Sequence, residues 1–509
     1  MRTRVGRVCV ALRANTVPEL LHRAEAALSE SQFLEFRLDS LQNPSAAVGQ
    51  IADFLSEHKD LIAIATCRRK AFGGCFNGSL AEELAILTAA ADAGFGLVDL
   101  EIESAEECLT SQYELLRETN AAILISFHDF ANASDPETAF ARIQRFEPDF
   151  VKIVTTAHSL TDSLNLLKWI KDRSGDAQLV GIAMGEAGIV SRVLSLRAGS
   201  TFTFASAPDG AETAPGQMTA RILRDLYRID QIDQATRIYG VAGNPISHSL
   251  SPLMQNSAFR RERINAVYLP LKTETVDDLL NLARQLPLSG ISVTMPLKQQ
   301  VLPHLANVDP LTSKLGACNT IRTGVDGKLY GFNTDVAGIV RPLEKRLSLK
   351  GARVLVLGAG GAARAAVYGL VDKGAHVSVW SRKEATAREL ASSAGAAAVS
   401  RKQVAASEFD VLINATPCGM HGNSHPLPLE TEEWRARLVF DLVYNPLDTP
   451  LLKAARARGI ATIQGVEMFV HQGARQFELW TGKPAPEAEM LRVVLFALHN
   501  KAHGPGSGT

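Results

Sequence analysis

The 509-residue sequence lacks the features that mark membrane, secreted and nucleic-acid-binding proteins. It has no uninterrupted apolar run of transmembrane length, and the early run VCVAL stops at Arg13, shorter than the core of a signal peptide. Its net charge is only -1, so no overall basic field favours nucleic acid or an anionic membrane. We therefore expect small-molecule substrates, no nucleic-acid or membrane partner, and local charges that bind any anionic ligand.

Cysteine is also scarce, with six residues in the chain. These cysteines form neither a C-x-x-C pair nor the spacing of a disulfide framework. Scattered thiols are typical of a reducing compartment, so we expect a cytoplasmic protein. The length exceeds what one hydrophobic core usually organises, which predicts two or three domains.

Short apolar runs recur through the first half of the chain, with gaps long enough for a helix between them. Residues 80–94 and 160–175, which fill two of these gaps, have helical periodicity. Eight strand and helix units in about 220 residues are typical of a (β/α)8, or TIM, barrel. An open doubly wound α/β sheet is the alternative. The predicted strands are RVCVAL, FLEFRLD, LIAIATC, GLVDLEI, AILISFHDF, DFVKIVTT, QLVGIAM and TFTFAS.

The pattern restarts after a boundary near residues 229–236. Residues 237–335 alternate strands with helical stretches, which predicts a smaller α/β domain. Residues 350–383, KGARVLVLGAGGAARAAVYGLVDKGAHVSVWSRK, then supply a strand, a glycine turn, a helix and a second strand in order. This order predicts a βαβ nucleotide-binding unit.

A lysine stands in the middle of the predicted strand DFVKIVTT. Because side chains alternate across a strand, Phe150, Lys152 and Val154 share one face. If that face lines the barrel, desolvation lowers the pKa of Lys152 and makes its amine nucleophilic toward carbonyls. A structural ion pair with Glu101 is the alternative. His128, on the adjacent strand, is a candidate proton carrier.

The first half resembles type I 3-dehydroquinate dehydratase across roughly residues 5–228. The resemblance depends on SFHDF, DFVKI, FLEFRLD, TCR, MGEAGIVSR and TAPGQ. It implies a TIM-barrel domain over residues 1–230, with no metal, in which Lys152 forms an imine with the substrate ketone and His128 moves the protons. It also assigns Glu35, Arg37 and Arg68 to the ring hydroxyls, and Arg192, Thr213 and Gln217 to the substrate carboxylate, which an arginine fork suits.

Two positions depart from this family. Many members have an acidic residue before the paired glycines that follow the strand 3 arginine, whereas this chain has Phe72 before Gly73 and Gly74. Thr213 stands where serine is common, which preserves the hydroxyl. Since Lys152 and His128 are kept, we expect reduced or differently supported turnover and not inactivity.

The motif VLVLGAGGAAR places glycines where a strand turns and backbone N–H groups meet a pyrophosphate at a helix N-terminus. NAD proteins usually have Asp or Glu at the end of the next strand, but this chain has Ser381, Arg382 and Lys383 there. A basic pair suits a 2′-phosphate, which favours NADP. A solvated charge pair is the alternative. The predicted cofactor-binding residues of this unit are Gly358, Ala359, Gly360, Gly361, Ala362, Ser381, Arg382 and Lys383.

Residues 237–500 resemble shikimate dehydrogenase. The resemblance depends on GNPISHSLSP, SVTMPLK, GACNTI, GFNTD, NATPCGM, DLVYNP and GVEMFVHQGARQF. It implies a substrate domain over 237–337 completed by 466–500, and a Rossmann-like NADP domain over 338–465. Lys298 and Asp335 become the catalytic pair, since an alkoxide formed by hydride transfer must be protonated and stabilised.

The same resemblance assigns the substrate and nicotinamide contacts of the second half. Taken singly, Asn319 or Ser249 would stabilise a turn and Lys298 would be a surface residue. By the family roles, Ser249 and Ser251 bind the substrate carboxylate. The ring hydroxyls are positioned by Thr294, Asn319, Asn333 and Gln472. The nicotinamide end of the cleft is shaped by Tyr444 and Gly465.

The two halves together resemble bifunctional enzymes that catalyse consecutive steps: 3-dehydroquinate to 3-dehydroshikimate, then reduction to shikimate with NADPH. A non-catalytic regulator of the quinate-repressor type is one alternative, and a second half that prefers quinate or NAD is another. The kept catalytic residues and the absence of a basic DNA-binding tract argue against the regulator. We expect no tight channel between the two sites.

Overall fold

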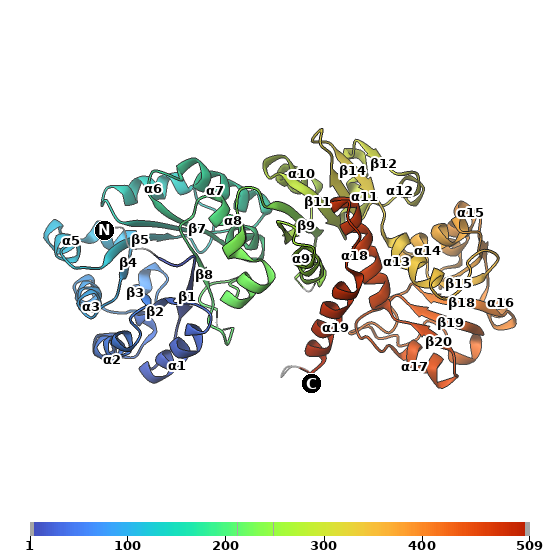
Figure 1. The fold of residues 1–509 in the computed structure, drawn as a ribbon, viewed down its shortest axis with the longest axis horizontal. Coiled ribbons are helices and arrows are strands. Elements are labelled where there is room, and N and C mark those ends of the chain that lie inside the picture. Colours follow the sequence, from blue (N-terminus) through green and yellow to red (C-terminus); the bar gives the residue numbers. More distant parts are fainter. Residues whose placement is uncertain (1–4, 211, 248, 504–509) are drawn as a thin grey trace. The chain divides into compact units, whose positions relative to one another are not determined.

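The computed structural model describes residues 5–210, 212–247 and 249–503. The chain forms two compact units, of which the first consists of residues 1–237 and 269–287 and the second of residues 238–268 and 288–509 (Figure 1). None of the helices in the described ranges combines the length and the apolarity needed to cross a membrane.

Eight parallel strands of the first unit form a nearly closed barrel in chain order. β1 pairs with both β2 and β8, so the last barrel strand returns to the first. An open doubly wound sheet would instead reverse its strand order at an internal switch point. The predicted (β/α)8 barrel is therefore confirmed. Its strands are β1 (Val8–Leu12), β2 (Phe33–Arg37), β3 (Ile62–Thr66), β4 (Leu97–Glu101), β5 (Ala122–His128), β6 (Phe150–Thr156), β7 (Gln178–Met184) and β8 (Thr203–Ala205).

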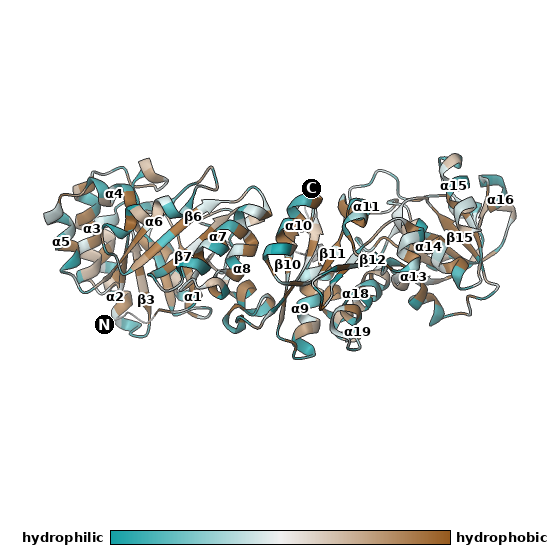
Figure 2. Ribbon diagram, turned by 90° about the horizontal axis from the view of Figure 1, so that it is seen from above, coloured by the Kyte–Doolittle hydropathy of each residue, from teal (hydrophilic) through white to brown (hydrophobic). Residues whose placement is uncertain are grey.

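Helices follow the barrel strands and cover them. In Figure 2 the strands are largely brown and the surrounding helices carry teal residues. Local signals set the helix starts; for example, Ser79 and Glu82 form a capping box at the beginning of α3. The helices are α1 (Val17–Leu28), α2 (Pro44–Glu57), α3 (Leu80–Asp92), α4 (Ile102–Glu107), α5 (Thr110–Arg117), α6 (Pro136–Gln144), α7 (Leu160–Arg173) and α8 (Ile189–Ala198).

The barrel interior is an apolar core that gives way to charged residues. Alternate strand residues such as Phe33, Leu124 and Phe150 pack there. Phe150 and Val154 both belong to this core, so Lys152, midway between them on β6, points to the same interior. The condition set for a nucleophilic Lys152, that its face of the strand lines the barrel, is therefore met.

A mixed six-stranded sheet opens the second half. Its strand order is β10-β9-β11-β13-β14-β12, and β11 runs parallel to β9 but antiparallel to β13. The strands are β9 (Arg237–Gly243), β10 (Ala266–Lys272), β11 (Leu288–Val293), β12 (Asn307–Val308), β13 (Thr320–Thr323) and β14 (Leu329–Phe332). The helices of this stretch of the chain are α9 (Ser251–Arg261), α10 (Val276–Gln285), which is part of the first compact unit, α11 (Leu297–Gln300), α12 (Pro310–Leu315) and α13 (Asp335–Glu344).

The last two helices, α18 (Gly465–Thr481) and α19 (Glu487–His503), pack back onto this sheet. In Figure 1 they are the red helices beside α9 and α13. Trp480 of α18 donates its indole N–H to the Ile321 carbonyl of β13 at 2.9 Å. Phe477 and Met490 share a core with Tyr239 and Phe259.

Residues between α13 and α18 form a parallel sheet with the order β17-β16-β15-β18-β19-β20. This order reverses between β15 and β18, which makes a topological switch point of the Rossmann kind. The boundaries of the three predicted domains stay predictions. The strands are β15 (Arg353–Leu357), β16 (His376–Trp380), β17 (Ala397–Ala398), β18 (Phe409–Asn414), β19 (Ala436–Asp441) and β20 (Ala461–Ile463), and the helices are α14 (Gly361–Asp372), α15 (Glu384–Ala394), α16 (Arg401–Ala406) and α17 (Pro450–Ala457).

Candidate active sites

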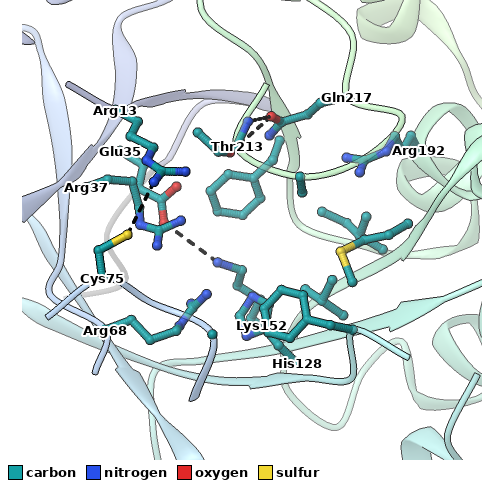
Figure 3. A pocket seen from close by; sticks show the side chains of 17 residues that line it. Arg13, Glu35, Arg37, Arg68, Cys75, His128, Lys152, Arg192, Thr213 and Gln217 are labelled. Carbon is teal, nitrogen blue, oxygen red and sulfur yellow. Dashed lines mark hydrogen bonds and ion pairs between the residues drawn. The ribbon is translucent and has the colours of Figure 1, made fainter. Parts of the chain in front are cut away.

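One pocket of the barrel gathers all the site residues predicted for the first half (Figure 3). They reach it from the strands, from the loops that follow and, for Arg192, from α8, at the end of the barrel where such enzymes bind their substrates. The predicted residues that line the pocket are Glu35, Arg37, Arg68, His128, Lys152, Arg192, Thr213 and Gln217.

Lys152 is buried, with 5% of its surface exposed. Its Nζ lies 3.0 Å from Asp99 Oδ2 and 3.7 Å from Glu35 Oε1, and 4.3 Å from the centre of the Phe204 ring. Burial alone would raise the pKa of Asp99, but the positive charges of Lys152 and Arg68 hold that pKa well below its usual range. The amine therefore lies between an aromatic face and two carboxylates, within reach of a ligand in the pocket.

The alternative interpretation, an ion pair of Lys152 with Glu101, is wrong, because the partner on β4 is Asp99. Glu101 instead interacts with Arg68 and Ser126. Arg68 Nε lies 2.8 Å from Glu101 Oε2, although its N–H does not point at that oxygen, so the two form an ion pair without a hydrogen bond. Ser126 Oγ donates to Glu101 Oε2 at 2.9 Å.

His128 is the last residue of β5. Burial and the positive charges of Arg68 and Lys152 lower the pKa of His128 well below its ordinary value. The ring is therefore neutral at neutral pH. Its Nδ1 lies 3.0 Å from each oxygen of the Glu101 carboxylate, which leaves Nε2 as the nitrogen available to a substrate. Phe130 stacks on the ring, with centroids 5.6 Å apart, and fixes its plane.

Arg192 is an unusual cation because it is only 1% exposed. One of its terminal nitrogens donates to the Pro215 carbonyl at 3.1 Å, but its buried Nε has no hydrogen-bond partner among the described residues. Burial lowers the pKa of Arg192 to about 10, against the opposing charge of Glu212. A buried guanidinium with a free donor, facing the pocket beside Thr213 and Gln217, suits a ligand carboxylate.

Phe72 occupies the position where many type I dehydratases have an acidic residue. Its ring lies against the guanidinium of Arg69, with the Arg69 Cζ 4.7 Å from the ring centroid. The loop after β3 therefore brings an aromatic ring where the family often has a carboxylate. The expected effect of this change on turnover stays a prediction.

The second half brings Lys298 and Asp335 together. Lys298 Nζ lies 2.8 Å from Asp335 Oδ2, and Asn319 Nδ2 donates to Asp335 Oδ1 at 2.8 Å. Asn319 is buried and also bonds Thr334, so it fixes the carboxylate that the lysine pairs with. Lys298 is in α11 and Asp335 begins α13, the helices that follow β11 and β14, so the predicted pair is assembled there as a proton donor.

Other predicted residues of this half are engaged by the protein itself. Asn333 accepts from the Asp335 backbone N–H and donates to the Ala317 carbonyl, so its amide shapes the loop. Gln472 Nε2 donates to the Phe469 carbonyl at 2.9 Å, and the Thr294 N–H donates to the Ala242 carbonyl. The predicted contacts of Thr294, Asn333 and Gln472 with ring hydroxyls stay predictions.

Ser249 and Ser251 lie at the N-terminus of α9. Ser249 Oγ accepts from the Ser251 backbone N–H at 3.3 Å. The N–H groups of a helix's first turn favour an anion, so this position suits a carboxylate. His248, which precedes Ser249 in the same motif, lies outside the described residues.

The glycine turn after β15 leaves room for a phosphate. Gly358 has a φ of +113°, and a Cβ there would lie 3.0 Å from the Ala415 carbonyl oxygen. A Cβ at Gly360 or Gly361 would meet nothing within 4 Å, so the start of α14 is open to a ligand. Ala359 and Ala362 lie in the same half-buried turn. These residues fit the pyrophosphate of a dinucleotide.

The basic pair after β16 is exposed. Ser381 Oγ donates to the Lys383 carbonyl at 2.9 Å and closes the turn, while Arg382 and Lys383 extend into solvent.

The two residues predicted for the nicotinamide end of the cofactor are Tyr444 and Gly465. The Tyr444 ring stacks on Phe469 with centroids 5.1 Å apart. Gly465 begins α18, where a Cβ would lie 2.4 Å from the Val443 carbonyl oxygen, so only glycine permits this close packing.

Similarity to known proteins extends over both halves. The chain is 33% identical over 505 residues to the chloroplastic bifunctional 3-dehydroquinate dehydratase/shikimate dehydrogenase of Arabidopsis thaliana, covering 94% of this chain and 83% of that protein. The chain belongs to the bifunctional 3-dehydroquinate dehydratase/shikimate dehydrogenase family.

Family models divide this bifunctional chain in the same order. Type I 3-dehydroquinase matches residues 8–234, the shikimate dehydrogenase substrate-binding domain 241–321, shikimate/quinate 5-dehydrogenase 342–431 and the shikimate 5′-dehydrogenase C-terminal domain 465–495. The NADP(+) shikimate dehydrogenase of Methanosarcina acetivorans is 40% identical, over 52% of this chain and 99% of that protein. A solved shikimate dehydrogenase in complex with NADP+ is 32% identical with a TM-score of 0.50, over 52% of this chain and 97% of that chain.

Several residues that line the pocket of the dehydratase half were not predicted as site residues. Arg13, Cys75 and Phe130 line the pocket, and Arg13 donates to the Cys75 sulfur at 3.3 Å. Arg13 directly follows β1, so its position at the C-terminal end of a barrel strand was a usable signal. Cys75 lies in the loop before α3, where no periodicity marks it.

Proposed function

We propose residue roles for the two activities of this bifunctional enzyme, the dehydration of 3-dehydroquinate and the NADPH-dependent reduction of 3-dehydroshikimate. The observation that carries the proposal is the buried amine of Lys152 in one pocket with a neutral His128 and an arginine that has a free donor. The pairing of Lys298 with Asp335 carries the second activity.

In the dehydratase half, Lys152 attacks the substrate ketone as a free amine, after its ammonium has given a proton to the neutral ring of His128 in the same pocket. His128 returns this proton to the oxygen that leaves as water. Loss of water gives an imine on Nζ, which acidifies the neighbouring C–H bond. His128 Nε2 removes that proton and returns it to the departing hydroxyl, which leaves as water. Glu101 accepts the Nδ1–H of the ring and so keeps Nε2 unprotonated. Hydrolysis of the imine then releases 3-dehydroshikimate and restores the amine.

In the dehydrogenase half, Ser249, Ser251 and the start of α9 bind the carboxylate of the substrate. NADPH supplies the hydride that reduces the ketone. Lys298 donates a proton to the oxygen as negative charge develops there, and Asp335 holds the ammonium in position.

The cofactor is held by residues of the Rossmann-like sheet. Gly360 and Gly361, at the open start of α14, bind the pyrophosphate through their backbone N–H groups. Arg382 and Lys383 bind the 2′-phosphate at the end of β16.

One assay tests both activities in sequence. Purified protein is mixed with 3-dehydroquinate and NADPH, and the absorbance of the reduced cofactor is followed. The signal falls only if dehydration produces the ketone that the second half reduces. A preparation that consumes NADPH with 3-dehydroshikimate but not with 3-dehydroquinate would contradict the dehydratase assignment.

The alternatives of regulation and of other specificity are not favoured. The Arabidopsis relative is named as an enzyme and not as a regulator, and the Methanosarcina relative is named for shikimate and NADP(+). A reducing compartment such as the cytoplasm stays our proposal for the location, supported by six cysteines that are all free thiols.

Replacing Arg192 by lysine tests carboxylate binding. We expect Arg192→Lys to raise the KM for 3-dehydroquinate about 10- to 100-fold with a smaller change in kcat. Lysine keeps the charge, but it cannot donate to both oxygens of a carboxylate at once as a guanidinium does. Arg197→Lys on the same helix is the matched control, since Arg197 bonds only backbone carbonyls at the surface. Steady-state kinetics on both variants provide the measurement, and an unchanged KM in Arg192→Lys contradicts the assignment.

Replacing Arg382 tests cofactor choice. We expect Arg382→Ala to raise the KM for NADPH about tenfold while leaving that for NADH nearly unchanged, because the arginine is assigned to the 2′-phosphate, which NADH lacks. Arg388→Ala, on the exposed face of α15, is a control of equal charge. The ratio of kcat/KM for the two cofactors is measured with 3-dehydroshikimate. An equal fall in kcat/KM for NADPH and NADH would show that Arg382 does not bind the 2′-phosphate.

A further inference from the structure

Arg13 places a positive charge in the dehydratase pocket that the proposed mechanism has not used. Within the described ranges of the chain, no carboxylate lies at ion-pair distance from it, and its guanidinium donates only to the Cys75 sulfur at 3.3 Å. Other cations of the pocket, unlike Arg13 and Arg192, are paired with acids. Arg37 donates to both oxygens of Asp39, and Lys152 pairs with a carboxylate of β4.

The backbone that carries Arg13 is fixed on both sides. The Arg23 side chain donates to the Arg13 carbonyl. Ser40 Oγ accepts from the Ala14 N–H at 3.3 Å and donates to the Ala14 carbonyl at 2.8 Å. The side chain of Arg13 therefore extends from an anchored point at the C-terminal end of β1, and it does not belong to a free loop.

The contact with the Cys75 sulfur holds the guanidinium of Arg13 only weakly, because sulfur is a weak hydrogen-bond acceptor. The backbone N–H of Cys75 donates to Asp39 Oδ2 at 3.0 Å, and Asp39 is itself held by Arg37. The thiol is thus fixed at the rim of the pocket. An oxygen of a ligand, which is a stronger acceptor, can replace the sulfur as the hydrogen-bond partner of Arg13.

The place of Arg13 differs from that of the carboxylate-binding arginine. Figure 3 shows Arg13 with Cys75 on one side of the pocket and Arg192 on the other, with Lys152 between the two sides. A substrate whose carboxylate meets Arg192 and whose ketone meets Lys152 turns the rest of its ring toward Arg13. The groups on that part of 3-dehydroquinate are the two hydroxyls that dehydration leaves in place.

We propose that Arg13 is a substrate-binding residue that donates hydrogen bonds to these two ring hydroxyls, exchanging the Cys75 sulfur for the ligand's oxygens. The proposal rests on the function proposed above for Lys152 and Arg192. A guanidinium has several N–H groups in one plane, so it can bond two adjacent oxygens at once. Arg13 then selects ligands that carry hydroxyls on this side of the ring.

The test is Arg13→Met in the full chain, with Arg117→Met as the matched control. Arg117 is on α5 and pairs with Glu114 at the surface. Methionine keeps most of the length of the side chain but has no donor. We expect the KM for 3-dehydroquinate to rise about tenfold with kcat within about twofold of the wild type, and the control to match the wild type.

A ligand pair identifies the group that Arg13 contacts. Inhibition of dehydration is measured with two cyclohexane carboxylates, one with the two ring hydroxyls and one without them. Arg13→Met should weaken only the hydroxylated compound, by about tenfold, whereas Arg192→Lys should weaken both. Equal weakening of both compounds in Arg13→Met would overturn the proposal, because the arginine would then act on the carboxylate.

The remaining measurements separate ligand binding from a role in the loop. If Arg13 only tethered the rim, Cys75→Ala would remove the same tether and raise the KM as much as Arg13→Met, and this result would overturn the proposal. We expect Cys75→Ala to raise it no more than about twofold. Unchanged reduction of 3-dehydroshikimate by Arg13→Met shows that the preparation is sound. A wild-type protein that failed to dehydrate 3-dehydroquinate would instead refute the proposed function itself.

Discussion

Lys152→Met is expected to abolish dehydration of 3-dehydroquinate, with a fall in kcat of at least about 10⁴-fold, while reduction of 3-dehydroshikimate continues at the wild-type rate. Methionine is close to lysine in length and packs well in an apolar wall. It has no amine, so no imine forms and the C–H bond next to the ketone keeps its ordinary acidity. Kinetics of the two half-reactions, each with its own substrate, provide the measurement.

Mass spectrometry gives this expectation a second readout. After borohydride reduction with ligand, the wild-type chain should gain the mass of the reduced adduct at Lys152, and the variant should gain none. Lys168→Met, on the exposed side of α7, is the control and should be labelled like the wild type. Removing the lysine also leaves Asp99 without its close cation, so thermal unfolding is measured to confirm that the barrel is folded. Adduct formation in Lys152→Met would mean that another amine performs the chemistry.

Lys298→Met and Asp335→Asn are expected to give the reverse pattern, in which reduction of 3-dehydroshikimate falls about 10³-fold and dehydration is unaffected. Lys298 is the proton donor, so its loss leaves the developing alkoxide without a cation or a proton. Asp335→Asn keeps the shape of the side chain and a contact with Asn319, but it removes the charge that orients the ammonium.

Comparison of these two variants separates their roles. Because Lys298 and Asp335 act as a pair, the double variant should lose little more than Lys298→Met alone. Lys314→Met on α12 has the same chemical change at an exposed position and should be active. Equal rates for wild type and Lys298→Met with saturating NADPH would exclude this lysine from the chemistry.

The elements of the barrel were predictable because each strand is a short apolar run separated from the next by a helix-length segment. Lys152 was predictable for the same reason, since a charged residue inside such a run is conspicuous. Its partner was not predictable from alternation alone, because Asp99 and Glu101 lie on the same face of one strand. Arg68, which follows β3, and Ser126 of β5 contact both carboxylates, so only the distances in the fold identify Asp99 as the partner.

The second site was partly predictable. The glycine turn and the basic pair after β16 are local signals, and their geometry is local too. Asn333 shows the limit, because its residue type suits a ligand hydroxyl and a backbone amide equally. Only the fold reveals that both ends of the amide are bonded to Asp335 and Ala317. Rim residues such as Cys75 come from loops, in which no periodicity constrains the sequence.

The return of α18 to the β11–β13 sheet has a consequence for biosynthesis. Gln476 of α18 bonds Thr320 and Ser292, and Trp480 bonds Ile321. The strands β11 and β13 are therefore synthesised well before the helix that completes their hydrogen bonds. The ribosome releases all eight barrel strands before it has begun the cofactor sheet, so the nascent dehydratase has its whole sequence far sooner. A chain without α18 would thus contain every barrel strand but not the helix that packs on the β11–β13 sheet.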